Sequence, residues 1–146
     1  MNNILYGCKL VCKVATGIYA GNELYCTLVE QPARLDCGTN AGISHWRKMY
    51  SKAAALTTSL SVVSFSSAFG AYYYLNDNNW LAAGLIMLSI LPYSYFAQST
   101  TNYALEDPSL EKESVAAKNL LERWGRIEAL KALMGFVALV LINIEA

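Results

Sequence analysis

Ionisable and polar side chains recur along the first apolar stretch of this chain at a helical spacing. Intervals of four and three residues separate, in order, Lys9, Lys13, Thr16, Ala20, Glu23, Thr27 and Glu30. In a helix, residues at these intervals lie on one face. Lys9 and Lys13 lie near one end and can extend their ammonium groups towards water. Glu23 lies deeper, so its carboxylate needs a partner or a cavity inside the protein.

Polar groups from other segments could meet Glu23 at the same level. The candidates are Asn22, His45, Trp46, Gln98, Asn102, Trp124, Arg126, Glu128 and Lys131, of which Trp124, Glu128 and Lys131 share a face by their spacing. One interpretation is a salt-bridged cluster that sets helix register, with Glu23 paired to Arg126 or Lys131. The other is a pocket for a small molecule, with Glu23 or His45 as a base. The residues themselves leave both interpretations open.

Three of these residues also have simpler interpretations. His45 is expected to be a histidine at the membrane interface. Trp46 and Trp124 are expected to be belt residues, because tryptophan favours the boundary between lipid and water, rather than platforms for stacking.

The composition predicts an integral, multi-pass membrane protein. Hydrophobic residues make up 55% of the chain and charged residues 15%, against about 45–50% and about 25% in soluble domains. Between Ala53 and Leu105 the only charged residue is Asp77, so this segment cannot supply a soluble surface. A net charge of zero offers no basic surface for nucleic acid. The four cysteines and single histidine do not form a metal-binding pattern, so no metal site is expected.

Four apolar segments are each close to the ~20 residues that a helix needs to cross a bilayer. They cover about residues 4–29, 53–74, 80–102 and 127–144. The short polar segment at residues 75–79 predicts an antiparallel hairpin of the second and third helices. The chain is therefore predicted to be a single all-α domain, a four-helix transmembrane bundle with both termini on one side.

The two longer connections are predicted to differ in structure. Residues 30–52 are expected to form a loop, within which residues 43–52 begin the second helix early. Residues 105–126 contain an additional amphipathic helical segment that either lies at the membrane face or runs into the fourth span. Lys and Arg are concentrated in both connections, which places them in the cytosol by the positive-inside rule and leaves the organelle open.

Four short motifs resemble, in order, those of the anthrone-oxygenase-like family of small four-helix membrane proteins. They are GIYAGNELYCTLVEQPAR at residues 17–34, HWRKMY at 45–50, TTNYAL at 100–105 and LLERWGRIEALKAL at 120–133. The similarity extends over nearly the whole chain. Most members of the family are uncharacterised, and a few are associated with the oxidation of anthrones to anthraquinones by O₂ without a known cofactor.

The resemblance implies roles for particular residues if that chemistry is retained. Glu23 would be the base that removes a proton from a benzylic carbon of the substrate. Arg126 or Lys131 would stabilise the developing enolate-like oxygen. Gln98 and Asn102 would orient the substrate. No cofactor is expected.

Two classes of function remain. The first is a cofactor-free enzyme, or a binding protein, for a small lipophilic molecule. The second is a non-enzymatic membrane protein, either a homo-oligomer or a subunit of a larger membrane assembly. Small residues of the second span, such as Ser61 and Gly70, favour the second class because they allow helices to pack closely. An open, polar-lined pocket that reaches Glu23 would favour the first class over the second.

Overall fold

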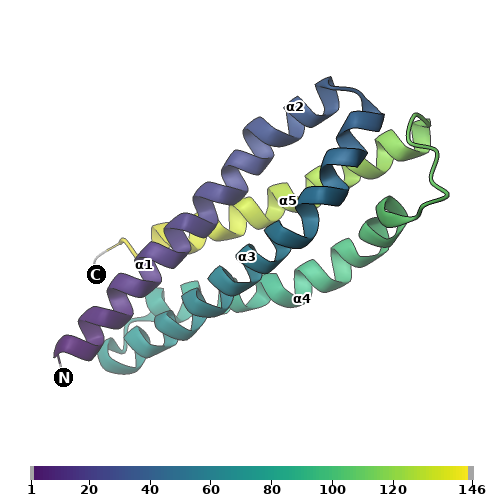
Figure 1. The fold of residues 1–146 in the computed structure, drawn as a ribbon. Helices are drawn as coiled ribbons and strands as arrows, with labels where there is room; N and C mark the ends of the chain where they lie inside the picture. Colours follow the sequence, from purple (N-terminus) through teal and green to yellow (C-terminus); the bar gives the residue numbers. More distant parts are fainter. Residues whose placement is uncertain (1, 145–146) are drawn as a thin grey trace.

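The chain forms long helices joined by short connections (Figure 1). The structure is a computed structural model and describes residues 2–144. Its elements are α1 (Asn2–Tyr25), the π-helical segment η1 (Cys26–Glu30), α2 (Gln31–Asp36), α3 (Thr39–Leu75), α4 (Asn78–Glu106) and α5 (Val115–Leu141). No strand occurs among these described residues, which confirms the predicted all-α class.

The elements are arranged as four antiparallel rods (Figure 1). The first rod consists of α1, η1 and α2, which follow one another without a break, and α3, α4 and α5 are the other three. The first rod packs against α3 and α5, and α4 packs against the same two helices. This is an up-down-up-down bundle, in which α1 begins and α5 ends on the side of the α3–α4 turn.

The early start of the second helix at residues 43–52 is confirmed, because α3 begins at Thr39, but the loop predicted before it is wrong. Only Cys37 and Gly38 separate α2 from α3. Pro32 does not interrupt the first rod, because it lies in the first turn of α2, where a residue without an N–H donor is well tolerated. Gly38 has a φ of 88°, a conformation that glycine adopts without strain. A glycine at this position therefore allows the chain to reverse direction within two residues.

The tight turn predicted near residues 75–79 is confirmed. Asn76 and Asp77 alone connect α3 to α4. The N–H of Asn76 donates to the carbonyl oxygen of Tyr72 at 2.7 Å and closes α3. A side-chain oxygen of Asp77 accepts from the N–H of Asn79 at 2.9 Å and caps the start of α4. Local hydrogen bonding at both helix ends thus defines the hairpin.

The amphipathic segment predicted before the fourth span is not a separate helix. Residues 107–114 connect α4 to α5, and from Val115 onward the segment continues directly into the fourth rod. The Ser114 hydroxyl caps α5 by accepting from the N–H of Ala117 at 3.1 Å. Of the two predicted alternatives, the one in which the segment runs into the last helix is therefore correct.

The buried apolar core is divided into two clusters. The cluster towards the termini includes Tyr19, Trp80 and Met87, and the cluster towards the α2–α3 turn includes Trp46 and Trp124. The expectation that Trp46 and Trp124 form a belt at the membrane interface is wrong, because only 0% and 3% of their surfaces are exposed. Between the two clusters lies a layer of buried charged groups contributed by α1 and α5.

Exposed apolar side chains occur on the outside of all four rods. By length and composition, α3 and α4 are each able to cross a membrane. The other two predicted spans, in α1 and α5, do not meet the same criterion and stay a prediction. In α1 and α5, charged residues such as Glu23 and Lys131 are buried, whereas Ile18 and Leu133 are exposed. At the level of the charged layer, these two helices therefore bury charged groups and expose apolar ones.

We expect Gly135→Leu to destabilise the bundle and Gly21→Leu to be tolerated. A Cβ atom on Gly135 would lie 2.7 Å from the ring of Tyr19, whereas one on Gly21 would meet no atom within 4 Å. Tyr19 is fully buried and has no room to move, and such overpacking costs about 1–3 kcal/mol. Thermal unfolding in detergent, followed by circular dichroism, should show a midpoint roughly 5 °C lower for Gly135→Leu alone. Equal midpoints for the two variants would contradict the close approach of α1 and α5.

Candidate functional site

The inward face of the first rod carries the central carboxylate of the site. Thr16, Ala20 and Glu23, all members of the predicted polar stripe, are buried. The stripe continues less deeply to Thr27 and Glu30: both residues are half-buried, the hydroxyl of Thr27 is buried, and Glu30 lines the pocket described below. The most deeply buried face of the rod therefore changes its register after Glu23.

A π turn produces this change of register. In η1 the N–H of Gln31 donates to the carbonyl oxygen of Cys26, five residues earlier, rather than four as in an α-helix. The next residue is Pro32, whose ring would clash with the carbonyl four residues before it in an unbroken α-helix, and the wider turn accommodates it. The buried positions are consequently Glu23, Cys26, Gln31 and Arg34.

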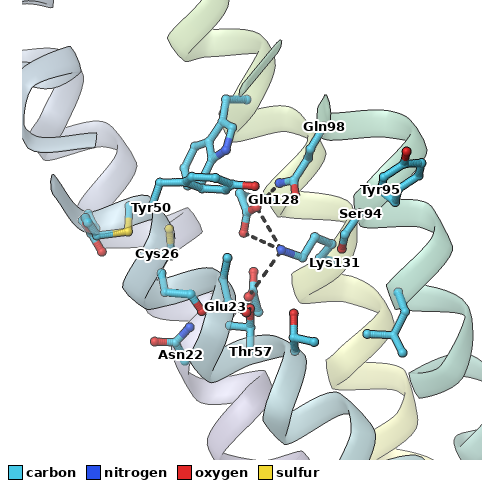
Figure 2. Close-up of a pocket in the computed structure, with 17 residues that line it drawn as sticks. Asn22, Glu23, Cys26, Tyr50, Thr57, Ser94, Tyr95, Gln98, Glu128 and Lys131 are labelled. Atoms are coloured by element: carbon cyan, nitrogen blue, oxygen red, sulfur yellow. Dashed lines mark hydrogen bonds and ion pairs between the residues drawn. The ribbon is translucent and has the colours of Figure 1, made fainter. Parts of the chain in front are cut away.

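Glu23 meets two residues of α5 in the layer between the apolar clusters (Figure 2). Lys131 Nζ lies 3.0 and 3.2 Å from the two carboxylate oxygens of Glu128 and 3.8 Å from Oε1 of Glu23. Gln98 of α4 donates from Nε2 to Oε1 of Glu128. All four side chains belong to residues that are at most 5% exposed. Of the two partners predicted for Glu23, the structure therefore selects Lys131.

The negative charge of Glu23 is less well neutralised than that of Glu128. One ammonium group can neutralise one carboxylate, and the shorter distances assign Lys131 to Glu128. The second oxygen of Glu23, Oε2, is buried and has no hydrogen-bond partner among the residues described. A buried carboxyl group without partners is costly. Glu23 is thus the group that can exchange a proton with a bound molecule or accept a hydrogen bond from it.

A pocket of about 450 Å³ lies beside this charged cluster (Figure 2). Its volume falls within the range of about 300–1,000 Å³ that is typical of small-molecule sites. The small side chains of Ala53 and Ala54 in α3 help to leave this space open. The complete lining, to which all four rods contribute, is Asn22, Glu23, Cys26, Glu30, Met49, Tyr50, Ala53, Ala54, Thr57, Thr58, Leu91, Ser94, Tyr95, Gln98, Trp124, Glu128 and Lys131.

An aromatic cluster supports the pocket on its side towards the α2–α3 turn. Tyr50 stacks on Trp46, with ring centroids 4.8 Å apart and 13° between the ring planes. Trp124 meets Trp46 edge-on at a centroid distance of 6.1 Å. Nδ2 of Asn102 donates to the hydroxyl oxygen of Tyr50 at 2.6 Å. Packing and a hydrogen bond thus hold the Tyr50 ring in one orientation.

The structure brings together most of the residues that the sequence singled out. Those that line the pocket are Asn22, Glu23, Gln98, Trp124 and Lys131. Asn102 and Trp46 do not line it but contact Tyr50, which does. Arg126 and His45 lie elsewhere: Arg126 is exposed in a hollow between α2 and α5, and His45 borders a separate hollow at the α2–α3 turn.

Arg34 holds His45 outside the pocket. Its Nε donates to Nδ1 of His45 at 3.3 Å, and its Nη2 lies 2.6 Å from Oε1 of Glu30. The third contact is from Nη1 to Oε1 of Gln31, at 2.5 Å. The guanidinium carbon also lies 5.1 Å from the centre of the Trp124 ring, in the range of a cation–π contact. His45 itself is exposed, which suits a histidine at an interface better than a base acting in the pocket.

Two residues of the site were given no chemical role by the sequence analysis. Glu128 carried a usable signal, because it shares one helix face with Trp124 and Lys131. Tyr50 lies one helical turn after Trp46, within residues 43–52, which were already expected to be helical, so the spacing of the two rings was a usable signal as well. The early start of the second helix at residue 43 already places Tyr50 and Trp46 on one face.

The cysteines are all unpaired thiols. Cys12 and Cys26 are buried, Cys8 is half-buried and Cys37 is exposed. Within residues 2–144, no group of three or more His, Cys, Asp or Glu residues is arranged to hold a metal ion.

A comparison with protein families found a match over two thirds of the chain. The family model described as anthrone oxygenase matches residues 46–141. The matched range contains Gln98, Glu128 and Lys131, whereas Glu23 and the rest of the first rod precede it. No match was found among curated proteins or among solved structures.

We expect Lys131→Met to destabilise the protein strongly and Lys118→Met to have little effect. Without Lys131, two buried carboxyl groups lose the cation that lies beside them among the described residues, and breaking a buried pair in this way costs about 3–5 kcal/mol. Lys118 forms an exposed pair with Glu122 at 3.9 Å, and such surface pairs contribute about 0–1 kcal/mol. Thermal unfolding in detergent measures both effects.

A double variant tests whether the contact itself is responsible. Glu128→Gln combined with Lys131→Met removes a carboxylate together with its cation, so the loss should be smaller than the sum of the two single losses. Simple addition of the single effects would argue against a direct interaction between Glu128 and Lys131.

Proposed function

This chain belongs to the anthrone oxygenase family, and we propose that it is a multi-pass membrane protein that binds and oxidises a lipophilic aromatic ketone beside Glu23. The observation that carries the proposal is the open pocket at Glu23, together with the absence of any described partner for Oε2 of that residue. If side chains had filled the space beside Glu23, a purely structural or assembly-forming protein would have been favoured instead.

A membrane location suits such a substrate. Two helices are long and apolar enough to cross a bilayer, and α1 and α5 turn exposed apolar side chains outward. We therefore place all four rods across the membrane, with the charges of the site sheltered by neighbouring helices. The 29 residues of α4 correspond to about 43 Å of helix. Because the hydrocarbon layer is ~30 Å thick, the rods extend beyond it.

The first step of the proposed reaction is a proton transfer. In anthrone, the carbon opposite the carbonyl group carries two benzylic hydrogens. The Glu23 carboxylate removes one of them as a proton, and the C–H electron pair is delocalised through the rings onto the carbonyl oxygen. Glu23 is suited to this role because its ammonium partner is closer to Glu128 and its Oε2 atom has no partner within residues 2–144.

The second step is oxidation by dioxygen. O₂ accepts the electrons and forms a C–O bond at the benzylic carbon, and the proton held by Glu23 passes to the outer oxygen, which gives a hydroperoxide. Loss of the second benzylic hydrogen as a proton breaks the O–O bond, releases water and leaves a second carbonyl group. One O₂ is consumed and one H₂O is released for each CH₂ group converted to C=O, so no further reductant is required.

The other polar residues of the pocket have supporting roles in this scheme. The Lys131 ammonium offsets part of the negative charge that develops when the enolate forms in a poorly solvated site. Glu128 and Gln98 hold that ammonium in position through the contacts described above. Arg126 has no role in the scheme, because it lies outside the pocket.

We expect Glu23→Gln to abolish proton transfer from the substrate. The glutamine amide has nearly the same shape but cannot act as a base, so the rate should fall about 10²-fold or more. The measurement is the exchange of the benzylic hydrogens of anthrone for deuterium in D₂O without O₂, followed by mass spectrometry with purified protein in detergent. Conversion to anthraquinone in air should decrease in parallel.

Arg126→Gln is the matched control, because it also removes a charge but lies outside the pocket. It should exchange deuterium and form anthraquinone at the rate of the unaltered protein. Full exchange and full oxidation by Glu23→Gln would refute the assignment of Glu23 as the base. Absence of any protein-dependent exchange in the unaltered chain would refute the proposed reaction as a whole.

A further inference from the structure

We propose that the hydroxyl group of Tyr50, oriented by Asn102, donates the hydrogen bond that holds the carbonyl oxygen of the substrate. This inference rests on the proposed function, since it assigns the group that faces the base across the bound ketone. It adds a residue that the sequence did not indicate, and it gives Asn102 a positioning role through Tyr50 in place of direct contact with the substrate.

The direction of one hydrogen bond is the first support. Nδ2 of Asn102 donates to the hydroxyl oxygen of Tyr50 at 2.6 Å. A phenol has a single O–H donor in addition to its acceptor lone pairs. Because the contact with Asn102 uses a lone pair, the hydroxyl proton of Tyr50 remains available for another acceptor. Tyr50 lines the pocket, so a carbonyl oxygen bound there can be that acceptor.

The second support is that the donors of Lys131 and Gln98 are already engaged. Lys131 Nζ contacts both oxygens of Glu128 and lies 3.8 Å from Glu23. Nε2 of Gln98 donates to Glu128. These groups supply charge to the pocket, but their short contacts are made within the protein. The Tyr50 hydroxyl is held in place by Asn102 and still has a proton to donate. The Nε1–H of Trp124, in the same pocket lining, is a second donor without a partner among the described residues.

Placement within the pocket is the third support. Figure 2 shows Tyr50 and Glu23 on opposite sides of the Lys131 ammonium group. In an anthrone, the carbonyl carbon and the benzylic carbon occupy opposite positions of the central ring. A ketone that presents its benzylic carbon to Glu23 therefore directs its oxygen towards the side of Tyr50. Stacking on Trp46, which is fully buried, fixes the plane of the Tyr50 ring.

The donor has a kinetic consequence. Negative charge moves onto the carbonyl oxygen as the benzylic proton leaves, so a hydrogen bond from Tyr50 becomes stronger in the transition state than in the bound ketone. Removing one donor of this kind typically lowers the turnover rate about 10²–10³-fold. The effect on KM should be much smaller, because the bound ketone carries little charge on its oxygen.

Tyr50→Phe is the direct test, because it keeps the stacked ring and removes only the hydroxyl group. We expect about a 10²-fold loss in the rate of anaerobic deuterium exchange, with little change in KM or in the thermal midpoint. Tyr103→Phe removes a hydroxyl from an exposed tyrosine next to Asn102 and should leave the rates unchanged. Equal exchange rates for Tyr50→Phe and the unaltered protein would overturn the inference.

Asn102→Asp tests the positioning role. A carboxylate at this place accepts a hydrogen bond, so the Tyr50 proton turns towards it and away from the pocket. The infrared carbonyl band of bound anthraquinone reports this directly, since a hydrogen bond shifts the band to lower frequency. We expect the shift in the unaltered protein and its loss in both Tyr50→Phe and Asn102→Asp. A shift that survives in both variants would contradict the proposal even if turnover had fallen.

Failure of the inference can be distinguished from failure of the proposed function. If the unaltered chain exchanges deuterium and Glu23→Gln does not, but Tyr50→Phe is fully active, the reaction stands and the role of Tyr50 is refuted. If the unaltered chain neither exchanges deuterium nor binds anthraquinone, both proposals fall together.

Discussion

The arrangement of the bundle depends on the buried ion pairs that the Lys131 ammonium forms with Glu23 and Glu128. Removing three ionisable groups from water costs several kcal/mol for each ion, and only close, well-oriented partners offset that cost. The partners come from two rods, and Gln98 from a third completes the hydrogen bonding. The first rod, α4 and α5 must therefore meet at one level, and the apolar clusters on either side of this level exclude water from it.

The same ion pairs contribute to the lower hydropathy of α1 and α5, which do not pass as candidate membrane spans, whereas α3 and α4 do. Glu23, Glu128 and Lys131 lower the average for these two helices, together with other charged residues such as Lys9 and Arg126. The three residues of the cluster are buried, however. Average hydropathy does not distinguish inward from outward residues, and our proposal that all four rods cross the membrane requires apolar residues only where the protein meets lipid.

The sequence was sufficient to predict those features of the fold that depend on local, periodic patterns of residues. The all-α class, the Asn76–Asp77 hairpin and the inward direction of Glu23 follow from composition, turn residues and spacing. It failed where two local signals conflicted. Pro32 and Gly38 suggested a loop, but a π turn and a first-turn proline kept the rod helical. It also failed for Trp46 and Trp124, because a propensity for interfaces yielded to packing within the core.

A π turn in the middle of a rod is equivalent to one extra residue carried in an otherwise continuous helix. Each residue rotates the helix by about 100°. Deleting one residue between Cys26 and Glu30 would turn α2, with Gln31 and Arg34, away from α5 while Glu23 kept its place. A gain or loss of one residue in this short stretch thus rotates α2 about the axis of the rod. It changes the contacts of Gln31 and Arg34 with Leu121 and Trp124 of α5 and leaves the Glu23 carboxylate in place.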